Sequence, residues 1–281
     1  MIPSHIHRVA TFTRGGHHGA LVGLAELDGD ASAELRPTAE ELAHLGLHAM
    51  VYVAPPRRDD CTRRLRTFTA QRELPLSSKA PLAAAVALGV TDTAHFEQGV
   101  IATEIARSDD INGVASWTLP VARPVINGRP VEDRALAASA LGLDVSHLAQ
   151  DLPVQSVSCG WLSVLVPVES VEALSRAKLD TVLWQRVIEK AKPVYAVAFV
   201  PSREGPVPMR CLVANASDDE GTGLAAASVT EWLTRFGVRP LDGRVTEVTQ
   251  AQSRVRVALD GAIARITGTA KLVGEVTLDW R

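Results

Sequence analysis

The chain has 281 residues, of which 46% are hydrophobic and 22% are charged, a balance typical of an ordinary globular protein and not of a disordered one. Its 29 basic and 32 acidic residues are intermixed and leave a formal net charge of -3, which argues against nucleic-acid and membrane partners and favours a small-molecule ligand. The length suits two domains that each bury their own core.

The first residues contain no apolar core of signal-peptide length, and no later segment reaches the ~18 apolar residues of a membrane-spanning helix. We therefore expect a cytoplasmic protein. The three cysteines, Cys61, Cys159 and Cys211, are far apart and form no Cys-x-x-Cys pair. This spacing predicts buried thiols and neither a disulfide framework nor a zinc site.

Apolar segments separated by turns predict strands and helices in the first half of the chain. The predicted order is a strand at 9–12, a turn at Gly15, Gly16 and Gly19, a strand at 20–27, a helix at 38–45, strands at 49–54 and 65–68, and an Ala-rich helix that ends at Gly89.

Residues 116–129 break the periodicity with Pro120, Pro124, Asn127 and Gly128, which predicts a linker. We expect an N-terminal domain at 1–118 and a C-terminal domain at 126–281, with the last strands as candidates for returning to the first domain.

The second half repeats the element order of the first. A turn at 158–160 precedes a strand at 161–168, helical stretches at 171–190, strands at 194–200 and 209–213, and a second Ala-rich helix at 224–236. This echo predicts a duplicated α+β unit.

Small residues lie on nearly every face of both Ala-rich helices, which suits a helix at the centre of a curled sheet. The alternative is a buried helix in an open α+β layer.

Five short segments form an ordered set of motifs along the chain. They are Phe12-Thr13 with Gly19, Leu47 to Val53, Phe68-Thr69 with Glu73-Leu74-Pro75, Ser158-Cys159-Gly160, and Asp219 to Gly223. In this order they resemble the PhzF-type isomerases of phenazine biosynthesis, which have the diaminopimelate-epimerase fold. The resemblance implies two pseudo-symmetric α+β domains, each a curled, mostly antiparallel sheet around a central helix, and a homodimer.

The departures from the family pattern fall at its functional positions. Where the family has its acid/base Glu, this chain has Ala49, and Lys79 and Leu224 replace a His and a Ser. A methyl group cannot accept a proton, so the family's standard transfer of a proton from carbon by that Glu is disfavoured here. Asp219 and Thr222 are retained.

The resemblance implies a site in the cleft between the domains, facing the N-termini of both central helices, where free backbone N–H groups favour anions. The candidate catalytic residues are Asp219, Glu220, His48 and Lys79. Each has a structural alternative: a helix cap for the two acids, a half-buried residue entering a strand for His48, and a surface lysine for Lys79.

The loops around these positions supply the candidate substrate-binding residues. They are His17, His18, Gly19, Ala49, Ser77, Ser78, Gly221, Thr222 and Gly223. No cofactor is expected, because the glycines of the first turn do not form Gly-x-Gly-x-x-Gly. No metal is expected either, because His5-x-His7 has no third ligand at a spacing typical of a metal site.

Two functions remain open. The first is a repurposed, cofactor-independent isomerase or cyclase that acts on a small metabolite, in bacterial specialised metabolism. The second is a catalytically silent member that binds a ligand or a partner protein.

Overall fold

The computed structural model describes residues 5–29, 35–188, 195–213, 218–219, 222–240 and 244–277. The chain divides into two compact units. Unit 1 comprises Met1–Pro120, Gln252–Arg254 and Ile266–Arg281, and unit 2 comprises Val121–Ala251 and Val255–Arg265. The C-terminal segment therefore returns to the unit in which the chain begins.

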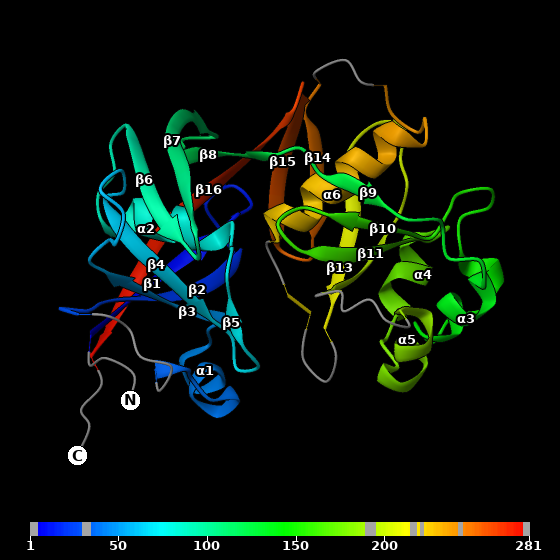
Figure 1. The fold of residues 1–281 in the computed structure, drawn as a ribbon, viewed down its shortest axis with the longest axis horizontal. Helices are drawn as coiled ribbons and strands as arrows, with labels where there is room; N and C mark the ends of the chain where they lie inside the picture. Colours follow the sequence, from blue (N-terminus) through cyan, green and yellow to red (C-terminus); the bar gives the residue numbers. More distant parts are fainter. Residues whose placement is uncertain are drawn as a thin grey trace. The chain divides into compact units, whose positions relative to one another are not determined.

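The strands of unit 1 form a closed series. Their order is β1-β2-β3-β4-β6-β7-β8-β16, and β16 also pairs with β1, as Figure 1 shows for the red and blue strands. Closure removes the exposed edges that an open sheet would have. The strands are β1 His5–Thr11, β2 Ala20–Glu26, β3 Ala49–Ala54, β4 Arg63–Phe68, β6 Thr93–Gln98, β7 Ile101–Ile111, β8 Val114–Ala122 and β16 Ile263–Thr277, and the short β5 Glu73–Leu74 pairs with β4.

Helix α2 (Lys79–Ala87) contacts strands β1, β2, β4 and β7 of this series. Its residues from Lys79 to Ala85 are all buried, so the helix has no solvent-facing stripe over that length. Four alanines and one proline among them keep the helix narrow, which lets the strands approach it closely.

Helix α1 (Ala39–Leu45) begins at a capping box. Thr38 Oγ1 accepts a hydrogen bond from Glu41 N at 3.1 Å, and Glu41 Oε2 accepts one from Thr38 N at 2.7 Å. The helix ends at Gly46, whose φ of 65° lies in the left-handed region. Its buried leucines pack against Met50 and Tyr52 of β3.

Unit 2 contains the strand order β14-β13-β12-β11-β10-β9, with β15 beside β14. Helix α6 (Gly223–Arg235) contacts β9, β10 and β11 and is buried from Gly223 to Leu233 (Figure 1). The strands are β9 Val125–Asn127, β10 Gln155–Ser158, β11 Leu162–Pro167, β12 Tyr195–Phe199, β13 Val207–Leu212, β14 Thr246–Gln250 and β15 Ser253–Asp260.

Three further helices of unit 2 share a second apolar cluster that includes Leu141 and Trp184. They are α3 (Arg134–Ser139), α4 (Val171–Arg176) and α5 (Thr181–Ile188), and a 3-10 turn, η2, covers Val145–His147. The helical stretches predicted over 171–190 are α4 and α5, and positions 189–190 lie outside the described residues. Asp180 precedes α5, and its Oδ1 accepts hydrogen bonds from the N–H groups at the start of that helix.

The strand pairings repeat from one unit to the other. β2 runs parallel to β3, which is antiparallel to β4; β11 runs parallel to β12, which is antiparallel to β13. The strands and helices predicted from the sequence lie in the predicted order. Residues 116–129, where a linker was predicted, are mostly strand, in β8 and β9, and the boundary between the units follows Pro120.

The fold is thus a mixed α/β arrangement in which sheet dominates, with a barrel-like closure in unit 1 and few helices. All three cysteines are free and buried, as predicted. Among the described helices, none has the length and apolarity to cross a membrane.

Candidate functional site

Asp219 lies just before helix α6 with its backbone held at several points. Its N–H donates to Cys211 O at 3.0 Å, and its carbonyl accepts hydrogen bonds from Thr222 Oγ1 at 2.9 Å and from Gln250 Nε2. Its carboxylate Oδ2 accepts a hydrogen bond from the hydroxyl of Tyr195. The side chain is therefore held in place, as an acid/base group must be.

The neighbouring carboxylate has a different environment. Asp218 forms an ion pair with Arg210, with Arg210 Nε 2.6 Å from Asp218 Oδ2. The same guanidinium donates to three backbone carbonyls between Leu174 and Ala177. Asp218 thus anchors an arginine that ties β13 to the end of α4, whereas Asp219 faces a phenol that can both donate and accept a proton.

Thr222 is the N-cap residue of α6 and is 4% exposed. Its hydroxyl bonds back to Asp219 O and does not cap the helix. Asp219, for which a helix cap was the structural alternative, has its side chain engaged by Tyr195. Glu220 and Gly221 lie outside the described residues.

The start of helix α2 brings three predicted residues together in unit 1. Ser77, Ser78 and Lys79 are 2%, 3% and 4% exposed, so the alternative of a surface lysine is wrong. Ser77 Oγ accepts from the N–H groups of Lys79 at 3.2 Å and Ala80 at 3.4 Å, and so caps α2. A buried ammonium is uncommon in proteins, which makes Lys79 a stronger site candidate than its sequence position alone suggested.

His48 is half-buried directly before β3, and its Nδ1 accepts a hydrogen bond from Leu21 N at 3.2 Å. The same Nδ1 lies 3.4 Å from Leu21 O, so the backbone group with which it pairs depends on the tautomer of the ring. Ala49, the first residue of β3, is 1% exposed and contributes only a methyl group.

The Gly-rich turn between β1 and β2 presents His17 and His18 to solvent. Gly19 has a φ of 98°, and a Cβ there would lie 2.6 Å from Thr11 O, so this position requires glycine. The turn thus fixes where both imidazoles emerge, and the structure shows no contact that assigns either one a role.

Two residues of unit 2 near Asp219 were not predicted. Tyr195 begins β12, is 3% exposed, and packs edge-to-face on Trp161 with ring centroids 6.1 Å apart. Its polar hydroxyl in an otherwise apolar, buried strand was the available sequence signal. Gln250 ends β14 and gave no signal, because only pairing in the fold brings it to Asp219.

Cys159, from the turn before β11, lies in one of the segments that resemble the family. Burial raises its pKa to about 12, so the thiol stays protonated near neutral pH. It is therefore not a thiolate nucleophile or base.

Comparison with known proteins finds relatives over nearly the whole chain. The "Uncharacterized isomerase YddE" of Escherichia coli (strain K12) is 24% identical over 273 residues, which cover 92% of this chain and 88% of the relative. Among solved structures, a Bacillus anthracis phenazine biosynthesis protein of the PhzF family is 18% identical with a TM-score of 0.82, covering 100% of both chains. A predicted epimerase, PA4716 from Pseudomonas aeruginosa, is 21% identical with a TM-score of 0.80, covering 99% of this chain and 100% of its own.

These structural likenesses establish a common fold. The family model described as "PhzC-PhzF: Phenazine biosynthesis-like protein" matches residues 9–273. The resemblance predicted from the ordered segments is confirmed by this match, and the chain belongs to the PhzC-PhzF family of phenazine biosynthesis-like proteins.

Proposed function

We propose that this chain is a cofactor-independent isomerase, or a cyclase, of a small metabolite, in which Asp219 takes the proton-transfer role that the family gives to a Glu. The observation that carries the proposal is the Asp219–Tyr195 pair at the start of α6. Oδ2 of the carboxylate accepts a hydrogen bond from the phenol, which orients the group, and in this proposal the carboxylate takes a proton from a substrate carbon.

The chemistry at β3 supports this reassignment. Ala49 has no group that exchanges protons, and His48 Nδ1 is engaged by the backbone of Leu21. A reaction that moves a proton in this chain therefore needs its base elsewhere. Asp219 is a family-like position that retains a carboxylate, and its backbone is held by Cys211, Thr222 and Gln250.

The polarity of the two helix starts favours a substrate that carries a carboxylate. Thr222 does not cap α6 with its own side chain, and the N-terminal end of a helix carries a partial positive charge that favours an anion. The buried Lys79 adds a positive charge at the start of α2.

Proton transfer is tested without knowledge of the product. The purified protein is incubated in D₂O with a panel of small saturated and unsaturated carboxylic acids, and ¹H NMR follows the replacement of carbon-bound hydrogen by deuterium. For an acid that exchanges, Asp219→Asn should lower the exchange rate by about 10² to 10⁴-fold. Asp218→Asn is the matched control and should keep the rate, because that carboxylate serves the ion pair with Arg210.

Three outcomes contradict the proposal. Exchange that survives Asp219→Asn removes Asp219 from the reaction. A loss of equal size in Asp218→Asn, with the fold intact by circular dichroism, would show a structural effect of the loop. Acids that raise the melting temperature without exchange or conversion would favour the catalytically silent, ligand-binding function.

A further inference from the structure

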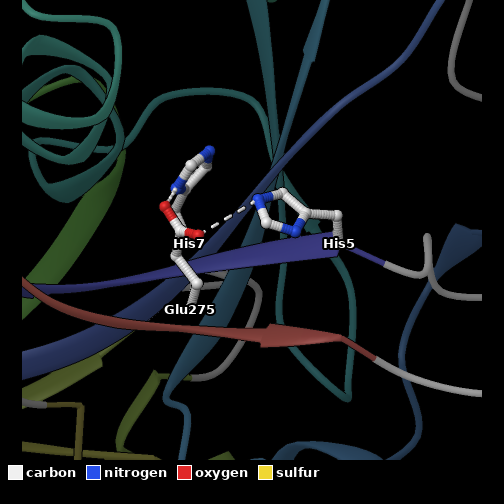
Figure 2. Close-up of side chains that lie close together, drawn as sticks. All are labelled: His5, His7 and Glu275. Atoms are coloured by element: carbon white, nitrogen blue, oxygen red, sulfur yellow. Dashed lines mark ion pairs between the residues drawn. The ribbon is translucent and has the colours of Figure 1, made fainter.

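Two histidines at the start of the chain meet a glutamate from its end. His5 and His7 lie on β1, two residues apart, so their side chains leave the same face of the strand while Ile6 between them is fully buried. Glu275 on β16 is the cross-strand partner of His7. Figure 2 shows the two imidazoles and the carboxylate converging above these two strands.

The distances within this trio suit a shared cation. His7 Nδ1 is 3.1 Å from Glu275 Oε1, His5 Nε2 is 3.6 Å from Glu275 Oε2, and the ligand atoms of all three lie within 4.8 Å of one another. Ligand atoms about 2.1 Å from a tetrahedral zinc ion are about 3.4 Å apart. The two nitrogen–oxygen separations are therefore close to those of a metal site, and a small rotation of the exposed His5 closes the third.

One polar atom of the trio is not satisfied by hydrogen bonding. His7 Nδ1 is buried and has no hydrogen-bond partner in the described part of the chain, although Glu275 Oε1 is 3.1 Å away. The nitrogen and the oxygen thus lie close without the alignment of an N–H···O bond. A cation between them would use a lone pair from each atom.

From these observations we propose that His5, His7 and Glu275 bind a divalent transition-metal ion of the zinc type. Two imidazoles and one carboxylate are a donor set suited to zinc, whereas Mg²⁺ prefers oxygen ligands only. His5 and Glu275 are 53% and 50% exposed in their side chains, which leaves the remaining coordination position to water.

The site would join the first strand of unit 1 to the strand that closes its series. β1 and β16 are far apart in the sequence and pair here through their backbones. A bound ion adds a link between them, and an ion that binds the folded state only stabilises it in proportion to its concentration. The site lies at the His5 end of β1, and the Gly-rich turn follows the other end, so its role is separate from the proposed chemistry.

Zinc binding is measured on tag-free protein by competition with a chromophoric chelator and by thermal unfolding at increasing zinc concentration. We expect one equivalent of zinc to bind, a melting temperature that rises with zinc, and no such effect of Mg²⁺. His5→Gln and Glu275→Gln should each weaken zinc binding at least about 10-fold. Loss of a residue that only supports a metal ligand already lowers metal affinity about 10- to 100-fold.

A second cross-strand pair offers a matched control. His95 Nε2 lies 3.6 Å from Glu104 Oε2, between β6 and β7, with the same cross-strand geometry but with a single histidine. His95→Gln should leave zinc binding unchanged. Less than one equivalent of bound zinc, or equal affinity in wild type, His5→Gln and Glu275→Gln, would overturn the proposal, as would a loss of binding in His95→Gln as large as in His5→Gln.

Discussion

The contact between Gly268 and Phe12 predicts a large effect of adding one methyl group. Gly268 lies on β16, and a Cβ there would be 2.3 Å from Cδ1 and 2.6 Å from Cε1 of Phe12, and 3.0 Å from Leu82 Cδ2. Carbon atoms in van der Waals contact are ~3.5–4.0 Å apart, so the ring must move by more than about 1 Å. Phe12 is fully buried, so its ring has no open space into which it could move. Its backbone also has a φ of 53°, in the left-handed region.

We expect Gly268→Ala to lower the free energy of unfolding by about 1–3 kcal/mol, the usual range for overpacking a core. The measurement is urea denaturation followed by circular dichroism and tryptophan fluorescence. Gly274→Ala is the control on the same strand: a Cβ there meets nothing within 4 Å, and the change should be neutral or stabilising by up to about 1 kcal/mol.

A double-mutant cycle separates the clash from a general effect on the strand. Phe12→Leu shortens the side chain that opposes Gly268, so the double variant should be more stable than the sum of the single changes by about 1 kcal/mol or more. Equal stability of Gly268→Ala and Gly274→Ala, or strict additivity with Phe12→Leu, would refute the reasoning.

Three other changes have defined outcomes. Arg123→Met should destabilise the fold by about 3–5 kcal/mol in chemical denaturation, because the carboxylate of Glu231 loses its ion-pair partner. Glu231 is 8% exposed, and its Oε2 lies 2.6 Å from Arg123 Nε. Adding Glu231→Gln to Arg123→Met should recover part of the lost stability, and no recovery would contradict this account. Thr38→Ala removes the capping box of α1 and should lower stability by about 1 kcal/mol, whereas Thr38→Ser should be close to wild type. Burial raises the pKa of Cys159 from 9.0 to about 12, so the folded state holds the thiol proton more tightly than the unfolded state. The protonated thiol therefore contributes its full stability below pH 9, and this contribution is lost as the pH rises toward 12. Cys159→Ala should show a shallower fall of the free energy of unfolding between pH 9 and 12, and an unchanged slope would contradict the raised pKa.

The strands, the helices and the family could be predicted from the sequence because their signals are local. The apolar run from Ala49 to Ala54 and the Ala-rich stretch before Gly89 each indicate one element, and turn glycines mark where each begins or ends. The segments that resemble the family are short stretches of contiguous residues, so they can be recognised without knowledge of the fold.

Parts of the candidate site could be predicted for the same reason. Ala49 at the position of the family's Glu, and Asp219 before α6, are visible in their own segments. The partners of these residues were not visible. Tyr195 and Gln250 reach Asp219 only because β12, β13 and β14 lie beside one another, and the backbone of Leu21 reaches His48 from a neighbouring strand.

The sequence by itself thus determined the element order and the family. The tertiary structure decided which side chains meet: it buries Lys79, and it brings Glu275 of the last strand against His5 and His7 of the first. The physical reason is that hydrophobic periodicity and turn chemistry act within a few residues, whereas a binding site depends on contacts between strands that the sequence separates by most of its length.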